Sequence, residues 1–431
     1  MHARWLFLAS LSIVASLALA EEPKAQLHWF KGNTHTHSLW SDGNDFPEMI
    51  SDWYASHGYD FLAISDHNIL ARGEMWRTEE LIEKRKITLG KKVIDKYRAR
   101  FGDEWVQTRT NGQGKLEVRL RPLAEYRGLL EKPGKFLLIE AEELTSGLGK
   151  VPVHINAVNL PEVVPPIKEG SSIRDIMRKN LQRLAEAAAR SGQPVVVHVN
   201  HPNFQWAITA EDLAHVVEDR YFEVFNGHPK TWSNGDAARA TAEHMWDIAN
   251  TIRLAELHAP ILYGMATDDS HHYHGGDNTP GRGWVMVHAA RLEAKSILEA
   301  MLRADFYASS GVILDEVGFD KETQTLHLKI HGEPGVHYHT VFHGTRRSYD
   351  TQVREVPSPA GDPNPIRLEY SADVGKALAE TNELEASYQL TGDELYVRAT
   401  ITSDAPHPNP AWAGQVQQAW IQPVGWEKWV K

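Results

Sequence analysis

Short apolar runs alternate with segments of helical periodicity through the first two thirds of the chain, and this alternation limits the possible folds. The expected strands are residues 27–32, 61–65, 136–144, 153–158, 195–199, 222–225 and 261–266. The expected helices between them are residues 47–57, 171–191, 236–258 and 292–303. Such alternation is typical of a parallel sheet with crossover helices. The number of units favours a closed or nearly closed barrel, whose functional groups gather where the strands end.

The expected strands run into side chains that bind metals. The first leads into residues 32–43, which contain a His-Thr-His and a Ser-Asp-Gly motif. Later strand ends carry Asp66-His67, Glu142-Glu143, His154, His198 with His201, Glu223, and Asp268-Asp269 with His271-His272. One histidine in a strand is more often a hydrogen-bonded core residue than a ligand. So many together exceed what one zinc ion uses, and they suit two or three divalent ions with bridging carboxylates.

Composition narrows the function further. The chain of 431 residues has no cysteine, which excludes thiolate zinc sites and cysteine nucleophiles. It is long enough to bury the core of one or two domains without disulfides. Its formal net charge of −12 argues against a nucleic-acid polymer as partner, because such a partner needs a basic surface. We expect a small-molecule substrate instead, most plausibly a phosphorylated one.

Residues 1–20 have the pattern of an export leader. Arg4 gives a positive start, and Ala18-Leu19-Ala20 resembles a cleavage site. The apolar run between them is too short to favour a membrane-spanning helix. We therefore expect a secreted or periplasmic protein without stable membrane insertion after cleavage of the leader.

Two segments depart from the alternating pattern. Residues 72–133 are long, charged and mostly helical in pattern, and we interpret them as an insertion over the barrel mouth, either a lid or a solvated decoration. Residues 305–431 contain short alternating runs, at 326–330, 366–370, 386–390 and 395–401, with Pro and Gly between them. This pattern predicts a small all-β, sandwich-like domain. Residues 21–304 then form the barrel, including the insertion.

The order of the motifs resembles that of the PHP (polymerase and histidinol phosphatase) family of metal-dependent hydrolases. The resemblance rests on His-Thr-His with Ser-Asp-Gly, then Ser-Asp-His-Asn, Glu-Leu-Thr, a strand histidine, Asn-His-Pro and Asp-Ser-His. It covers about residues 27–303. It implies an α/β fold, a distorted (β/α)7 TIM-like barrel that holds two or three divalent ions such as Mn, Zn or Fe. Many members of the family are phosphatases or phosphodiesterases.

The resemblance also implies a set of metal ligands. They are His35, His37, Asp42, His67, Glu143, His154, His201, Asp269 and His271. We expect His35 and His37 to serve one ion, and Asp42 with His67 and His271 to serve another. Asp66 is expected to orient an imidazole.

Some of these choices have close alternatives. Glu143 faces away from Glu140 and Glu142 on an alternating strand, and it fits the family pattern Gly-x-Glu-x-Thr, although Ala141 replaces the glycine. His201 is preferred to His198 because it lies at the strand exit. Asp268 and His272 adjoin the last pair of ligands and could shift that assignment by one residue.

Four residues are expected to take part in catalysis directly: Asp269, His271, His228 and Arg282. Two cations lower the pKa of a shared water, so that a bridging hydroxide can attack phosphorus near neutral pH. His228 is a candidate to assist the leaving oxygen. Arg282 is a candidate to hold a phosphate by bidentate hydrogen bonds, or else a surface arginine of its loop. Asn68, Asn200 and Asn226 are candidates to orient the substrate or a water.

The predicted function is therefore a metal-dependent phosphoesterase acting on small phosphate esters. The alternative is a metal-dependent carbamate, ester or amide hydrolase that uses the same site. A third possibility is a binding module that has lost catalysis, but such a module should also have lost ligands. A phosphate clamp would separate the first two, and only Arg282 stands out for that role.

Overall fold

A computed structural model describes residues 26–430 of the chain. The predicted leader at residues 1–20 lies outside the described residues. Within residues 26–430, no helix combines the length and the apolar character that crossing a membrane requires.

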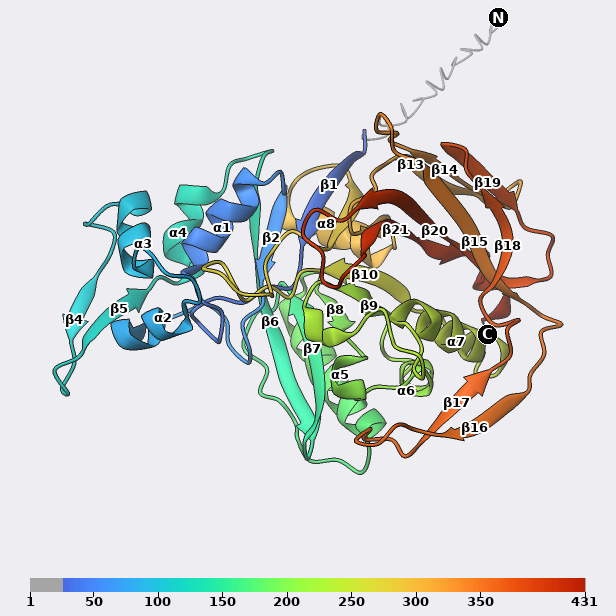
Figure 1. The fold of residues 1–431 in the computed structure, drawn as a ribbon, viewed down its shortest axis with the longest axis horizontal. Coiled ribbons are helices and arrows are strands. Elements are labelled where there is room, and N and C mark those ends of the chain that lie inside the picture. The colour runs from blue at the N-terminus through green and yellow to red at the C-terminus, as the bar shows by residue number, and fades with distance from the viewer. Residues whose placement is uncertain (1–25, 431) are drawn as a thin grey trace, which may run out of the picture.

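One large mixed sheet runs through the molecule (Figure 1). Its strand order is β10-β9-β8-β7-β6-β2-β1-β11-β12-β21-β20-β15-β18. The first half contains β1 (His28–Asn33), β2 (Phe61–Ile64), β6 (Leu137–Leu148), β7 (Val151–Val158), β8 (Val196–Val199), β9 (Tyr221–Asn226), β10 (Tyr263–Thr267) and β11 (Trp284–Ala289). The second half contains β12 (Phe306–Ser309), β15 (Tyr338–Arg346), β18 (Lys376–Thr381), β20 (Glu394–Pro406) and β21 (Val416–Val424). The mixed α/β class predicted from the sequence is confirmed.

The predicted run of parallel units is only partly present. Strands β1, β2 and β6 pair in parallel, and so do β8, β9 and β10. Strand β7, however, runs antiparallel to both of its neighbours, and β11 runs antiparallel to β1. The short turn between β6 and β7 leaves no room for a crossover helix, which parallel neighbours would need. Strand β10 contacts β11 but has no ladder to it within the described residues, so seven regular units are not confirmed.

Helices pack against the first half of the sheet and hold the strand ends in place. They are α1 (Pro47–Ser56), α5 (Ile173–Ser191), α6 (Ala210–His215), α7 (Ala242–Ala255) and α8 (Ala294–Leu302). Helix α5 begins at Ser172, whose hydroxyl accepts from the N–H of Asp175, and it ends at Gly192 in the left-handed conformation. Its buried stripe includes Met177 and Leu181.

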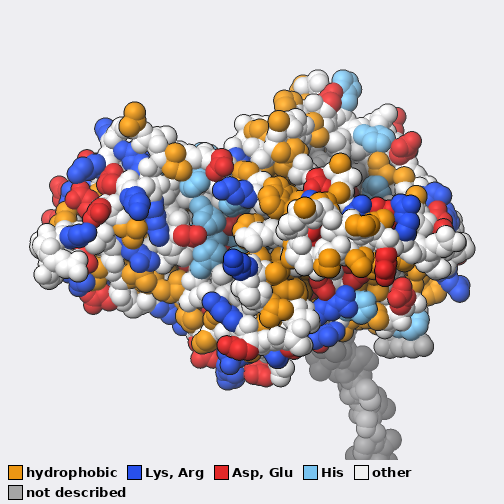
Figure 2. All heavy atoms as spheres, turned by 60° about the horizontal axis from the view of Figure 1, so that its bottom comes forward, with side chains coloured by type: hydrophobic (Ala, Val, Ile, Leu, Met, Phe, Trp, Pro, Cys, Tyr) orange, Lys and Arg blue, Asp and Glu red, His pale blue; other side chains and the backbone are white. Residues whose placement is uncertain are grey.

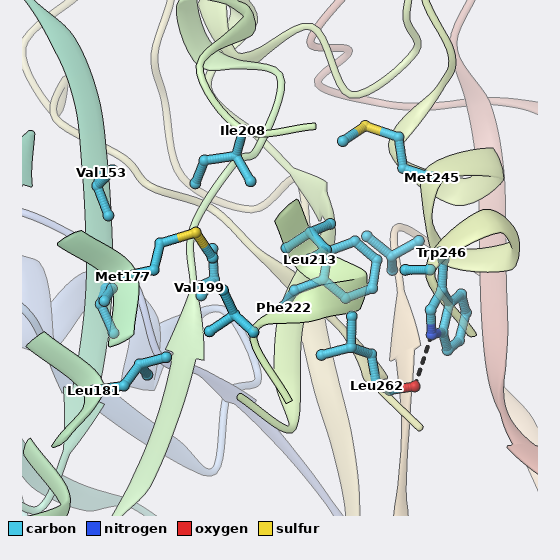
Figure 3. Close-up of a cluster of buried hydrophobic side chains, with 14 of the residues drawn as sticks. Val153, Met177, Leu181, Val199, Ile208, Leu213, Phe222, Met245, Trp246 and Leu262 are labelled. Carbon is cyan, nitrogen blue, oxygen red and sulfur yellow. Dashed lines mark hydrogen bonds between the residues drawn. The ribbon is translucent and has the colours of Figure 1, made fainter. Parts of the chain in front are cut away.

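A buried apolar cluster joins α5, α6 and α7 to β7, β8 and β9 (Figure 3). Met177 and Leu181 lie beside Val199, and Trp246 of α7 donates its indole N–H to the carbonyl O of Leu262 at 2.8 Å. Each large side chain buried here contributes roughly 1.5–3 kcal/mol. This core therefore fixes the strands whose ends carry the polar residues described below.

The segment 72–133 forms a lobe at the left of Figure 1. It contains β3 (Met75–Thr78), α2 (Glu79–Arg85), α3 (Val93–Phe101), β4 (Thr108–Thr110), β5 (Leu116–Leu120) and α4 (Leu123–Leu130). Besides the helices that the sequence predicted, it thus has an antiparallel three-stranded sheet, in the order β3-β5-β4. These strands are short and half-exposed, so they lack the apolar run that would reveal them in the sequence.

The C-terminal part continues the large sheet, because β12 pairs with both β11 and β21. A second sheet of β13 (Leu314–Asp320), β14 (Thr325–Ile330) and β19 (Glu385–Gln389) shares an apolar core with β15, β20 and β21. A two-stranded ribbon, β16 (Val353–Pro357) with β17 (Ile366–Tyr370), reaches back toward α6, where Tyr370 donates to Glu211 at 2.8 Å.

Candidate metal centre

The loop after β1 brings His35 and His37 into the interior, where both are fully buried. Thr36, between them, forms a bridge with Ser270, which follows β10. The backbone N–H of Asp269 donates to the carbonyl O of His35 at 2.8 Å. The first and the last of the predicted ligand segments are therefore joined directly through the backbone.

The side chains that the motif order assigned as ligands lie together at this end of the strands. They are His35, His37, Asp42, His67, Glu143, His154, His201, Asp269 and His271. Their nitrogen and oxygen atoms form four overlapping groups, each with all its atoms within 4.8 Å of one another. No other residue of the described chain joins such a group. Figure 2 shows histidine side chains gathered in a hollow of the surface between two lobes.

Two buried carboxylates lie among the histidines, and Glu143 belongs to two of the four groups. Glu143 lies with its Oε1 3.3 Å from Nε2 of His35 and 3.1 Å from Nδ1 of His154. Asp269 lies with its Oδ1 3.3 Å from His35 Nε2 and 3.1 Å from His37 Nε2. Glu143 thus lies between histidines of two different segments, and Asp269 lies between the two histidines of the loop after β1.

A third carboxylate marks the open side of the site. Asp42 is 51% exposed, and its oxygens lie 3.5 Å from Nε2 of His67 and 3.3 Å from Nε2 of His271. This group also contains His37. The site is therefore buried at His35 and opens to solvent at Asp42, which gives a substrate access from one side.

Glu223, which the sequence places at a strand end but which has no role among the predicted ligands, contacts two of them. Its Oε1 lies 2.7 Å from Nδ1 of His35, and its Oε2 accepts from the backbone N–H of His201 at 2.8 Å. A carboxylate on the far nitrogen fixes the tautomer and the orientation of a ligating imidazole. A fully buried glutamate among the apolar neighbours of β9 is the sequence signal that could have identified it.

Two asparagines at strand ends hold the carboxylates in place. The side-chain amide of Asn200 donates to Glu143 at 2.8 Å. The amide of Asn226 donates to Glu223 at 2.8 Å and to Asp269 at 3.2 Å. Asn200 and Asn226 therefore orient carboxylates of the site, rather than the substrate or a water as expected from the sequence.

Asp66 does not orient an imidazole, contrary to the sequence-based prediction. Its carboxylate accepts from the backbone N–H and the hydroxyl of Ser38 at 2.8 and 2.6 Å, and from the hydroxyl of Ser41 at 2.5 Å. Asp66 precedes His67 on the strand exit and so faces the loop that carries Asp42 rather than the ligands. It fixes the shape of that loop.

The alternatives next to the predicted ligands point elsewhere. Glu142 accepts from the backbone N–H of Val164 at 3.0 Å, away from the site. Asp268 accepts from Tyr54 at 2.7 Å and from the N–H of Arg282 at 2.6 Å. His198 and His272 belong to none of the four groups. Strand alternation separates Glu142 from Glu143 for the reason given above, because successive side chains face opposite sides.

Electrostatics keep the inner carboxylates ionised. Burial alone would raise the pKa of Glu143, but His67, His154 and His35 hold it well below its ordinary value. Burial likewise opposes ionisation of Asp269, yet neighbouring histidines, above all His35, hold its pKa well below the usual range. A cluster of buried anions requires compensating positive charge.

The site fits divalent cations. Nε2 of His35 and Nε2 of His37 are buried and lack a hydrogen-bond partner within the described part of the chain, although carboxylate oxygens lie 3.1–3.4 Å away. Buried polar atoms are rarely left unpaired, and such exceptions mark functional sites or missing ions. The donors are imidazole nitrogens and carboxylate oxygens only, which suit Zn, Mn or Fe.

Strained backbone occurs at several of these positions. Asn68, His201 and Asp269 have φ of 53°, 24° and 46°, in the left-handed region that non-glycine residues seldom occupy. Such conformations cost on the order of 1–3 kcal/mol each and persist where the surrounding structure imposes them. Here they turn the chain sharply at the strand exits and aim the ligand side chains inward.

His228 lies at the edge of the centre. Its ring is 5.7 Å from that of His271, and its Nδ1 accepts from the N–H of Lys230 at 3.0 Å. Burial lowers the pKa of His228 to about 4, so its ring is neutral at physiological pH. Its position is compatible with contact to a substrate, but a neutral ring does not serve as a strong acid.

Arg282 is not placed as the phosphate clamp that its sequence context suggested. The side chain is 4% exposed. Its guanidinium donates to the carbonyl O of Gly227 at 2.8 Å and to the carbonyl O of Asn409 at 3.1 Å. Arg282 thus ties the loop after β10 to the C-terminal part of the chain, and its donors are used inside the protein.

Comparison with known proteins gives matches among solved structures only. No protein-family profile and no curated protein sequence matches the chain. It is similar to a two-domain protein of Bacteroides vulgatus that contains a predicted PHP-like metal-dependent phosphoesterase, with 14% identity, a TM-score of 0.38, and coverage of 94% of this chain and 100% of that one. It is also similar to a candidate metal-dependent phosphoesterase of Bifidobacterium adolescentis, with 15% identity, a TM-score of 0.29, and coverage of 59% and 91%.

Proposed function

We propose that this protein is a PHP-type metal-dependent phosphoesterase that acts on small phosphate esters with two or three divalent ions. One observation carries the proposal. Nine histidine, aspartate and glutamate side chains from several strands and strand ends form four overlapping groups around buried ring nitrogens that have no partner in residues 26–430. Neither a core nor a structural ion-pair network needs such an arrangement.

In this proposal the residues of the site have different roles. Glu143 and Asp269 bridge, because each lies within 3.5 Å of two or more histidines. Divalent ions in these groups would supply an acidified water as nucleophile and positive charge for the phosphate oxygens. Glu223 keeps the Nδ1 of His35 occupied, so that its Nε2 faces the centre. His228, at the open edge, contacts the part of the substrate that leaves.

A carbamate, ester or amide hydrolase remains the second candidate, because one observation favours it. The donors of Arg282 are engaged by Gly227 and Asn409, so this arginine does not supply the anion clamp expected of a phosphatase. A screen of phosphomonoesters, phosphodiesters, carbamates and aryl esters with the metal-loaded protein separates the two candidates. Turnover of phosphate esters alone supports the first, and turnover of carbamates or aryl esters alone replaces it by the second.

The metal requirement has a sharp test in two neighbouring glutamates. Elemental analysis of the purified protein should find two or three equivalents of Mn, Zn or Fe. Glu143→Gln should lose bound metal, whereas Glu142→Gln should keep it, because Glu142 bonds to the backbone of Val164 instead. Equal metal content in both variants would contradict the assignment of Glu143.

The leader pattern supports a further part of the proposal, namely export to the periplasm or the medium. Cell fractionation followed by N-terminal sequencing tests it. The expected mature protein begins near Glu21. A full-length chain in the cytoplasmic fraction would contradict export.

A further inference from the structure

Two tryptophans form a stacked pair on the loops that leave the metal centre. The rings of Trp206 and Trp232 lie 4.9 Å apart with an interplanar angle of 17°. The Cζ of Arg239 lies 4.3 Å from the centre of the Trp206 ring. Trp232 is 38% exposed, which is unusual for so large an apolar side chain in a defined packing position. The pair is therefore held inside the protein on one side and offered to solvent on the other.

The backbone at this pair is strained. Gln205, Trp206 and Trp232 have φ of 52°, 56° and 47°. Bulky residues adopt the left-handed region only where the surroundings impose it, and such strain clusters at ligand-binding sites. Asn203 stabilises this backbone, since its amide donates to the carbonyl O of Trp232 at 3.0 Å and to that of Ala240 at 3.1 Å. These hydrogen bonds join the segment of Trp206 to the segment of Trp232.

The pair lies close to the proposed ligands. Phe204 has its ring 5.2 Å from that of His201 and 6.0 Å from that of His154. Trp206 follows Phe204 by two residues, which span at most about 7 Å of chain. Trp232 ends the short turn that begins after His228. The two short segments that carry Trp206 and Trp232 therefore both begin at the candidate metal centre, next to His201 and His228.

An open recess adjoins the aromatic pair. It has a volume of about 440 Å³ and is lined by Lys150, Gln205, Trp206, Trp232, Gly361 and Pro363, among others. Gly361 and Pro363 belong to the loop between β16 and β17, whose Asp362 accepts from Arg239 at 2.8 Å. The C-terminal part of the chain thus shapes this recess.

We propose that Trp206 and Trp232 form a stacking subsite that selects phosphate esters whose alcohol part carries a planar aromatic ring. The inference rests on the proposed phosphoesterase function and names its preferred substrate class. An indole face binds a flat π-system by stacking, which is worth about 1–3 kcal/mol per ring. The net charge of −12 argues for a single small ester rather than a polymer. A nucleobase and a simple aryl group share the required chemistry.

The first test measures binding without catalysis. Saturation-transfer NMR with adenosine, which carries no phosphate, should show contact of the base protons with the metal-loaded wild-type protein. The contact should be lost in Trp232→Ala and largely kept in Trp232→Phe. Trp76→Ala is the control, because Trp76 is a partly exposed tryptophan that lies outside the recess, against Arg109 at 4.1 Å. No contact in the wild type, or equal contact in Trp232→Ala, would overturn the subsite whatever the enzyme hydrolyses.

The second test measures selectivity. For the wild type, kcat/KM should be higher for adenosine 5′-monophosphate or phenyl phosphate than for glycerol 3-phosphate and glucose 6-phosphate. In Trp232→Ala the ratio of kcat/KM for the aromatic esters to that for glycerol 3-phosphate should fall roughly 5- to 100-fold, mainly through KM. Trp76→Ala should leave this ratio unchanged. An unchanged ratio in Trp232→Ala, or a larger loss for glucose 6-phosphate than for phenyl phosphate, would refute an aromatic subsite while the phosphoesterase function stands.

Discussion

Two buried clusters of polar side chains in this protein resemble each other in chemistry but differ in their hydrogen bonding. In one cluster every buried polar atom has a partner within the described residues, and in the other some do not. At the junction of α7 and β20, Arg398 donates to Asp247 at 2.8 Å and to Glu243 at 2.8 Å. Tyr396 also donates to Asp247, and Trp420 donates to Glu243. Each of these side chains finds a hydrogen-bond partner, and none of their buried atoms is left over in the described chain.

The cluster at the strand ends lacks such a cation. Its positive charge comes only from histidines, and Nε2 of His35 and of His37 remains without a partner in residues 26–430. The guanidinium of Arg398 completes one cluster from within the chain, whereas the other needs charge from outside. The comparison teaches that burial and polarity alone do not mark a functional site. At the strand ends, unpaired ring nitrogens coincide with a group of metal-binding side chains, and this combination distinguishes the two clusters.

The largest expected effect comes from removing ligands of the incomplete cluster. His37→Ala and Asp269→Ala should reduce hydrolysis to the uncatalysed rate, because each residue belongs to a candidate metal group. Circular dichroism and thermal melting should show that both variants still fold. Full activity in either variant would mean that the two clusters do not differ in function.

The complete cluster should respond in stability rather than in activity. Arg398→Ala leaves Asp247 buried without its cation and should lower the free energy of unfolding by about 3–5 kcal/mol. Urea denaturation measures this loss. A triple variant, Glu243→Gln with Asp247→Leu and Arg398→Met, should regain much of it, since neither carboxylate is then left without its cation. The activity per folded molecule should stay near the wild-type value, and a specific loss of kcat would refute a purely structural role.

Removing the metal should lower the stability of the protein by a smaller amount, and only through the cluster at the strand ends. Ions present at 100 to 1,000 times their dissociation constant stabilise a fold by about 3–4 kcal/mol. A chelator should therefore lower the Tm of the wild type, and it should lower that of Arg398→Ala by a similar amount. It should change His37→Ala much less. If the chelator left the Tm of the wild type unchanged, the result would contradict a metal centre.

Glu48, a buried carboxylate outside both clusters, extends the comparison to the pH dependence of stability. Glu48 is buried without a paired cation, and burial raises its pKa from 4.5 to about 7. The protonated form is the one that the fold favours, so stability is greatest below pH 4.5 and falls as the pH rises through about 7. The difference corresponds to about 3 kcal/mol. Urea denaturation at several pH values should show this fall in the wild type and a flatter profile in Glu48→Gln.

The smallest effect is expected at the residue that orients His35. Glu223→Gln weakens the contact to Nδ1 of His35, which lies 2.7 Å away, and should reduce metal affinity or activity about 10- to 100-fold. Metal titration monitored by calorimetry measures the affinity directly. Glu142→Gln is again the control. An unchanged affinity in Glu223→Gln would place Glu223 with the structural carboxylates instead.

Much of the fold could be predicted from the sequence, because buried apolar residues recur with the period of a strand or a helix. The expected strand at 366–370 coincides with β17, and the expected helix at 47–57 differs from α1 by one residue. The antiparallel course of β7 was not visible, since a buried strand reads the same in either direction. Strand β11 was overlooked, although Val285, Met286 and Val287 form an apolar run within it.

The candidate ligands were also visible, because metal-binding side chains at strand ends cannot be explained by a core. The residues that support them were harder to find. Glu223 has no motif around it, and its role depends on a contact with His35, which lies 188 residues earlier in the chain. The position of Arg282 could not be predicted for the same reason, since its hydrogen bond to Asn409 joins segments that are far apart in the chain.

The sequence by itself determined the α/β class and the inventory of nitrogen and oxygen donors, because both follow from local periodicity and residue type. Only the tertiary structure decided which of those donors face one another and which remain unpaired. It also decided that Trp206 and Trp232 stack beside the proposed centre. The physical reason is that charge compensation, hydrogen-bond satisfaction and ring stacking are relations between distant residues, and they exist only after the chain has folded.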